Sequence, residues 1–155
     1  MIKYIPNTFL PNRPFQVVAV DGKGEITCKE LYQINPKHRD GSRKKSQWLI
    51  KKHEEAGVFG WSLEHKSQSG KYYWGVFSDG YDCYILGRTE HNHQTKIARF
   101  ESNGHPRVWH GYPVDYINDP QNDCPNRAVL LEWVKFGVIN KSKIAKLIGG
   151  QGWKD

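Results

Sequence analysis

The chain has 155 residues, with 23 lysines and arginines against 16 aspartates and glutamates, a formal net charge of +7 and 13% aromatic residues. This length is typical of one domain, so we expect a single domain over residues 1–155. The composition excludes a membrane-spanning protein and a collagen, since no run approaches ~18 apolar residues, and the aromatic content argues against disorder. No export signal is recognisable at the start of the sequence, so we expect a cytoplasmic protein.

The N-terminal part of the sequence predicts a β-hairpin. Residues 1–14 contain three prolines, which favour an extended lead-in. Phe15 to Val20 is apolar and rich in β-branched residues, as a strand requires. The glycines of Asp21-Gly22-Lys23-Gly24 suit a tight turn, because glycine adopts positive φ without steric cost. The chain then returns over Glu25 to Ile34 as a strand, although the Leu31-Tyr32 half is equally compatible with a helix.

A surface helix is predicted next. Residues 35–45 form a basic loop, and from about Ser42 to Ala56 the pattern is helical, with Gly57 as the stop. One narrow face of this helix would hold Trp48, Leu49, Lys52, His53 and Ala56. The other positions are mostly charged, so we expect the helix to lie on the surface.

The middle of the sequence predicts an antiparallel meander of about five strands. Polar or glycine-containing turns recur about every ten residues, which leaves the ~5–6 residues that a strand needs between them. The strands are expected at residues 59–63, 72–77, 82–88, 95–101 and 107–112. The first shows a period of two, in which Phe59, Trp61 and Leu63 alternate with small or polar residues.

The C-terminal part predicts two helices packed on the sheet. Residues 113–125 are rich in proline and aspartate and indicate an irregular crossing. Asn126 is the expected N-cap of a helix that continues to Phe136, and Asn140 that of a last helix closed by Gly149-Gly150. The predicted fold class is therefore α+β: an antiparallel meander with an N-terminal hairpin, one surface helix and two C-terminal helices.

The three cysteines, Cys28, Cys83 and Cys124, are far apart in the sequence. No pair has the spacing of a zinc site or a redox pair. Their odd number fits a reducing compartment, and we expect them to be unreactive packing residues.

Most of the net charge is concentrated between residues 37 and 52, where seven lysines and arginines face Asp40 alone. A field of this size attracts polyanions, and Trp48 among these charges could stack on a base. The alternative is that Trp48 packs inward and the lysines form a solvated face. The candidate nucleic-acid-binding residues are Arg39, Arg43, Lys44, Lys45, Trp48, Lys51, Lys52, Arg107 and Trp109.

A second group of polar residues surrounds His110. If the last two strands pair around Asn103-Gly104, candidate catalytic residues come together: His110, Lys96, Arg99, Tyr112 and Asp115. An imidazole, a cation and a phenol suffice for RNA cleavage without a metal ion, because they can accept a proton, stabilise the charged phosphate and donate a proton. Alternatively, Trp109, Tyr112 and Tyr116 are core aromatics and His110 is a hydrogen-bonded histidine.

The remaining histidines do not predict a metal site. His91 and His93 flank Asn92 in a predicted turn, and His105 lies downstream. No carboxylate or cysteine completes a ligand set at a recognisable spacing. We therefore expect no metal and no cofactor.

Three functions compete on these observations. The leading hypothesis is a small basic protein that binds nucleic acid, RNA or single strands, and that could act as a toxin-like, metal-independent ribonuclease. The alternative is a non-enzymatic inhibitor or immunity-type partner that binds an acidic protein through its aromatic-rich sheet. The third is a small-molecule or nucleotide pocket lined by Trp74, Trp109, Tyr112 and Arg107. The Trp-His-Gly-Tyr-Pro string and the order of sheet before helices resemble small bacterial or phage accessory and toxin-like proteins. Whether the chain is an enzyme stays open.

Overall fold

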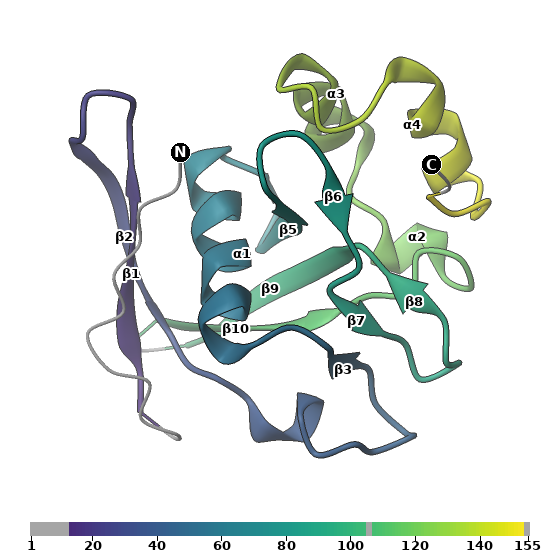
Figure 1. Ribbon diagram of the computed structural model, residues 1–155, viewed down its shortest axis with the longest axis horizontal. Helices are drawn as coiled ribbons and strands as arrows, with labels where there is room; N and C mark the ends of the chain where they lie inside the picture. Colours follow the sequence, from purple (N-terminus) through teal and green to yellow (C-terminus); the bar gives the residue numbers. More distant parts are fainter. Residues whose placement is uncertain (1–12, 105–106, 154–155) are drawn as a thin grey trace.

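The computed structural model describes residues 13–104 and 107–153 and shows a curved sheet wrapped around a helix (Figure 1). The strands of the curved sheet follow the order β1 (Phe15–Val20), β2 (Ile26–Tyr32), β10 (Val108–Pro113), β9 (Ile97–Asn103), β5 (Tyr72–Ser78) and β4 (Gln68–Ser69), with β6 (Cys83–Tyr84) also paired to β5. A small second sheet contains β3 (Gln47–Trp48), β7 (Gly87–Arg88) and β8 (Gln94–Thr95). The helices are η1 (Pro36–His38), α1 (Lys52–Glu64), α2 (Pro120–Asp123), α3 (Arg127–Lys135) and α4 (Lys141–Ile148).

The α+β class is confirmed, but the sheet is not a simple antiparallel meander. β10, β9 and β5 are antiparallel neighbours, as a meander requires. β10 also runs parallel to β2, with Val108 opposite Leu31 and Trp109 opposite Tyr32. This pairing attaches the N-terminal hairpin to the last strand of the sheet. The expected strand over residues 82–88 is divided between β6 and β7, which belong to different sheets.

The predicted helix over residues 42–56 and the predicted strand over 59–63 are both wrong, because the helix α1 begins at Lys52 and continues to Glu64. Phe59 and Leu63 pack in one core, whereas Trp61 packs in another. A helix that is covered on both sides has no polar face, so its sequence lacks the usual one-sided stripe. The alternation of Phe59, Trp61 and Leu63 reflects two cores rather than two faces of a strand.

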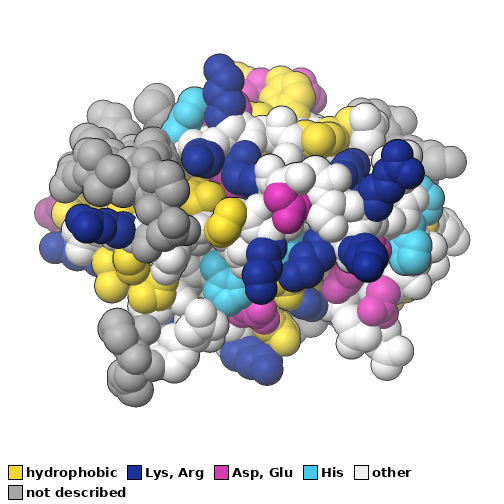
Figure 2. All heavy atoms as spheres, turned by 90° about the horizontal axis from the view of Figure 1, so that it is seen from below, with side chains coloured by type: hydrophobic (Ala, Val, Ile, Leu, Met, Phe, Trp, Pro, Cys, Tyr) yellow, Lys and Arg dark blue, Asp and Glu magenta, His cyan; other side chains and the backbone are white. Residues whose placement is uncertain are grey.

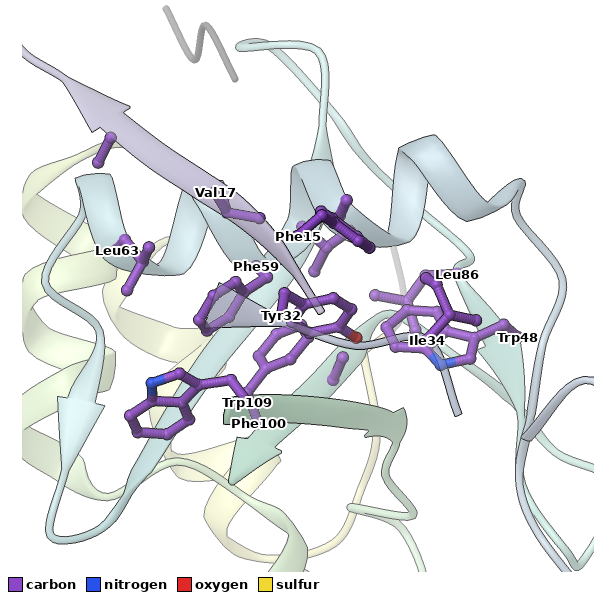
Figure 3. Packing of buried hydrophobic residues seen from close by; sticks show 14 residues of the cluster. Phe15, Val17, Tyr32, Ile34, Trp48, Phe59, Leu63, Leu86, Phe100 and Trp109 are labelled. Carbon is purple, nitrogen blue, oxygen red and sulfur yellow. The ribbon is translucent and has the colours of Figure 1, made fainter. Parts of the chain in front are cut away.

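The first core lies between α1 and the concave face of the sheet (Figure 3). Tyr32 and Phe100 pack on Phe59, with ring centroids 4.9 Å and 5.1 Å from its centroid, and Trp109 lies 5.9 Å away. All four side chains are almost completely buried. Each such aromatic side chain removes 150–250 Å² from water, so this cluster fixes α1 within the sheet.

The second core lies on the opposite, outer face of β5 and β9, where the C-terminal helices cover the sheet (Figure 1). Trp133 of α3 is fully buried there, and its Nε1 donates a hydrogen bond to Ser67 Oγ over 2.9 Å. The predicted caps are confirmed: Asn126 Oδ1 accepts from Val129 N, and Asn140 Oδ1 accepts from Lys143 N.

The N-terminal hairpin is also confirmed, with β1 over the expected residues and a turn in which Gly24 has a φ of +81°. Residues 1–12 of the expected lead-in lie outside the described residues. Among the described residues, no helix combines the length and the apolar character needed to cross a bilayer.

Candidate functional site

The outer face of β9 and β10 carries the polar residues that the sequence singled out. Alternation along β10 leaves Val108, His110 and Tyr112 partly exposed, whereas the residues between them are buried. His110 lies opposite Glu101, and Tyr112 lies opposite Arg99. His110, Tyr112 and Arg99 therefore share one face of the sheet.

His110 lies in the wall of a solvent-accessible cavity of about 250 Å³. Its side chain is 20% exposed, and its Nε2 lies 3.3 Å from Glu101 Oε1. The other lining residues come from the end of β2, the start of η1 and the facing strands: Gln33, Ile34, Asn35, Pro36, Asn103 and Val108. This imidazole is thus paired with a carboxylate but still reachable from solvent.

His38 contacts Tyr112 on the face of the sheet that also carries His110, a juxtaposition that the sequence did not reveal. Its ring stacks on Tyr112 with centroids 5.2 Å apart, and its Nδ1 donates to Ser46 O over 2.8 Å. Because a carbonyl oxygen can only accept, the neutral ring carries its proton on Nδ1, and Nε2 is the basic nitrogen. Burial lowers the pKa of His38, the bond to Ser46 opposes this, and the charges of Lys45 and His110 lower the pKa further. The charges of both His110 and Lys45 therefore act on His38.

The basic loop, residues 35–45, lies between β2 and β3 in the chain and contains η1. Its exposed cations are Lys37, Arg43, Lys44 and Lys45. Figure 2 shows the underside of the molecule, over which lysine and arginine side chains are spread with a few carboxylates among them. Arg88 of β7 holds the loop through a bond from Nη2 to Ser42 O over 3.2 Å.

Arg39 belongs to the same loop but turns inward. Its Nε and Nη2 lie 2.9 Å and 2.8 Å from Glu55 Oε1, and Tyr32 OH donates to Glu55 Oε2 over 2.5 Å. Burial raises the pKa of Glu55 to about 7, against the opposing effect of Arg39. Arg39 is therefore engaged in anchoring the loop to the core rather than presented to solvent.

Arg99 is enclosed by aromatic rings and acceptors. The ring centroids of Tyr72, Trp74 and Tyr112 lie 4.6 Å, 5.7 Å and 5.2 Å from its guanidinium carbon. Its Nε and Nη2 donate to Tyr112 OH, and its Nη1 donates to Asn122 O over 2.7 Å. These contacts fasten the segment around α2 to the outer face and leave the side chain 14% exposed.

Lys96 and Asp115 are placed differently from the other three candidate catalytic residues. Lys96 is buried, with its Nζ 5.5 Å from the ring centroid of Trp153. Asp115 is buried beyond the end of β10, where it accepts hydrogen bonds from Asn118. The five predicted catalytic residues are thus divided, with only His110, Arg99 and Tyr112 on the outer face.

The two tryptophans expected to stack on bases lie in the first core. Trp48 Nε1 donates to Gly111 O over 3.1 Å, and Trp109 Nε1 donates to Glu30 Oε2 over 3.1 Å. Neither ring can stack on a base without loss of core packing. Trp48 therefore packs inward, which is the alternative given for it in the sequence analysis. Trp74 lies in the second core, so the four residues of the third hypothesis do not surround one pocket.

The other predicted contacts are placed at the surface. Lys51 and Lys52 are exposed at the start of α1. Arg107 is exposed and forms an ion pair with Glu30. All three cysteines are free, and burial raises the pKa of Cys83 and of Cys124 to about 11, so both remain thiols at neutral pH.

Comparison of the chain with protein-family models, with curated proteins and with solved structures gives no match. The functional argument therefore depends on the geometry of the outer face and of the basic loop.

Proposed function

We propose that the basic loop and the outer face around His110 bind single-stranded RNA, and that His38 and His110 cleave it without a metal ion. The observation that carries this proposal is the position of His38, whose ring stacks on Tyr112, a residue on the same face of the sheet as His110. An imidazole pair beside exposed cations is the arrangement that phosphodiester cleavage needs, because it supplies a base, an acid and charge stabilisation.

Binding would depend on the four exposed cations of the basic loop. Each phosphate neutralised by a lysine or arginine releases counterions, so affinity falls with salt concentration. If Lys37, Arg43, Lys44 and Lys45 each contact one phosphate, the slope of log K against log salt is about −3 for a single strand. Buried Trp48 and Trp109 contribute no stacking in this mode.

Cleavage would be an internal transesterification of the RNA. His38 Nε2 takes the proton of the 2′-hydroxyl, and the oxygen attacks the adjacent phosphorus. The bond from phosphorus to the 5′-oxygen breaks, and protonated His110 gives its proton to that leaving oxygen. The products are a 2′,3′-cyclic phosphate and a free 5′-hydroxyl, so the step needs no co-reactant. His38 suits the role of base because burial lowers its pKa and keeps the ring neutral at pH 7.

The binding half is tested by fluorescence anisotropy with a labelled 12-nucleotide RNA in 50–200 mM salt. We expect the triple variant Arg43→Gln, Lys44→Gln, Lys45→Gln to reduce the magnitude of the salt slope by about 2. The control Lys23→Gln, Lys141→Gln, Lys146→Gln removes the same charge from exposed positions elsewhere and should bind nearly as the wild type does. Equal losses in both triple variants would mean that net charge, and not the basic loop, governs binding.

The cleavage half is tested separately, with the same RNA in chelator and with a strand that carries 2′-O-methyl groups. The wild type should release cyclic-phosphate products from the first strand only, and His110→Ala and His38→Ala should each reduce the rate to background. Binding without cleavage would refute the catalytic role and retain RNA binding. Absence of binding at low salt would refute both, and capture of an acidic protein partner would then favour the non-enzymatic alternative.

A further inference from the structure

Glu90, His91 and Asp115 come together beyond the C-terminal end of β10. Glu90 and His91 lie in the turn between β7 and β8, and Asp115 lies just after β10. One ligand atom from each lies within 4.8 Å of the other two, and His91 Nε2 is 4.0 Å from Asp115 Oδ2. We propose that these three side chains form a site for one divalent transition-metal ion such as Zn²⁺ or Co²⁺.

The ligand types favour such an ion. One imidazole and two carboxylates match the borderline preference of Zn²⁺ and Co²⁺ for nitrogen and oxygen. Tetrahedral coordination at about 2.0–2.2 Å needs the ligand atoms to be closer together than they are without an ion. Glu90 and His91 are exposed, so their side chains can make this adjustment without disturbing the core.

Asp115 is the fixed member of the set. Its side chain is only 3% exposed, and its two carboxylate oxygens accept from the backbone N and the side-chain amide of Asn118 over 3.1 Å and 2.8 Å. The Asn118 amide also lies 3.2 Å from His93 Nδ1. Hydrogen bonds of this kind orient a ligating carboxylate, so Asn118 is a positioning residue for the site.

Further charged side chains lie near the three ligands. Asp123 lies against the site, because its Oδ2 accepts a hydrogen bond from Asp115 N over 3.0 Å. Arg99 forms an ion pair with Asp123, and Arg43 and Arg88 line a pocket together with Glu90.

Binding is tested with the full-length protein, freed of metal by a chelator and then titrated with CoCl₂. Calorimetry should give a stoichiometry of one, and visible absorption should show the bands of bound Co²⁺. Excess Co²⁺ should raise Tm by about 5–10 °C when its concentration is about 100 times Kd, because the ion binds only the folded state. We expect His91→Ala and Glu90→Gln each to weaken binding at least tenfold, and Asn118→Ala to weaken it about 10–100-fold.

The matched control is His110→Ala, which removes the histidine of the His110–Glu101 pair and should leave Co²⁺ affinity unchanged. Circular dichroism of each variant shows whether the fold is retained. If an Asp115→Asn variant fails to fold, the variants at the exposed positions Glu90 and His91 decide the outcome. The proposal is overturned if the wild type shows no saturable binding, or if His91→Ala binds Co²⁺ as the wild type does. It does not depend on RNA binding, so either proposal can fail alone.

Discussion

The imidazole of His38 stacks on the phenol of Tyr112, with the two rings inclined by 19°. The same phenol oxygen accepts two hydrogen bonds from Arg99. Tyr112 therefore joins the basic loop on one side to the arginine that secures the α2 segment on the other.

Tyr112→Phe should separate these two roles. The ring that His38 stacks on is kept, and the acceptor for Arg99 is lost, so we expect a loss of about 1–3 kcal/mol in the free energy of unfolding. Tyr112→Ala removes the ring as well and should cost about 3–5 kcal/mol. Urea denaturation measures both. Equal losses would show that the stacked ring contributes nothing to stability.

Gly75→Ala should destabilise the contact between β5 and α1. A Cβ at this position would lie 2.8 Å from Val58 O and 2.9 Å from Val58 Cγ1, and a helix backbone cannot move aside easily. We expect a loss of about 1–3 kcal/mol from overpacking. Gly22→Ala is the control, since a Cβ there meets nothing within 4 Å, and it should change stability by less than about 0.5 kcal/mol. Thermal unfolding that places both variants at the same Tm would contradict the close approach.

Glu55 should make stability depend on pH in an unusual direction. Its pKa is about 7 in the folded protein and 4.5 in its ordinary state, so between these values the folded form holds a proton that the unfolded form has lost. The stabilisation is complete below pH 4.5 and disappears as pH rises through 7, a decline of about 3 kcal/mol. Glu55→Gln does not titrate, so the stability difference between wild type and this variant should fall over that range.

Denaturation at pH 5, 6, 7 and 8 measures this difference. The same series on Glu132→Gln, at an exposed position of α3, serves as the control and should give a difference independent of pH over this range. A constant difference for Glu55→Gln as well would show that Arg39 keeps the carboxyl group ionised throughout.

Asn126→Ala should destabilise the start of α3. Its Oδ1 accepts from Val129 N over 3.0 Å, and its Nδ2 donates to Ser69 Oγ over 2.6 Å. Loss of an N-cap costs about 1 kcal/mol, and loss of the second bond should bring the total to about 1–2 kcal/mol. Ser69→Ala isolates the second contribution and should cost less. Chemical denaturation in which the two variants lose the same amount would mean that the cap itself contributes little.

Local signals in the sequence predicted the hairpin and the C-terminal helices, because a turn glycine or a capping asparagine acts on its own neighbours. Gly24 and Asn126 are examples, and both occupy the expected positions. The helix α1 could not be predicted in this way, because the pattern of its buried residues depends on two cores formed by distant segments.

The candidate site was predictable only in part. Strand alternation correctly places His110 and Tyr112 on one face, and direct pairing brings Arg99 to Tyr112. The approach of His38 depends on the path of the basic loop between β2 and β3, which no spacing in the sequence encodes. The approach of His91 to Asp115 could not be predicted for the same reason. His91 lies in the turn between β7 and β8, whereas Asp115 follows β10.

The parallel pairing of Leu31 with Val108 has a consequence for how the chain is made. β10, which lies between β2 and β9 in the sheet, is translated after β1, β2 and α1. Until β10 is made, Tyr32 and Phe59 lack their contact with Trp109, and the incomplete first core stays accessible to water and to chaperones. A nascent chain that ends before β10 would therefore keep apolar surface of the first core exposed, as incompletely folded chains do.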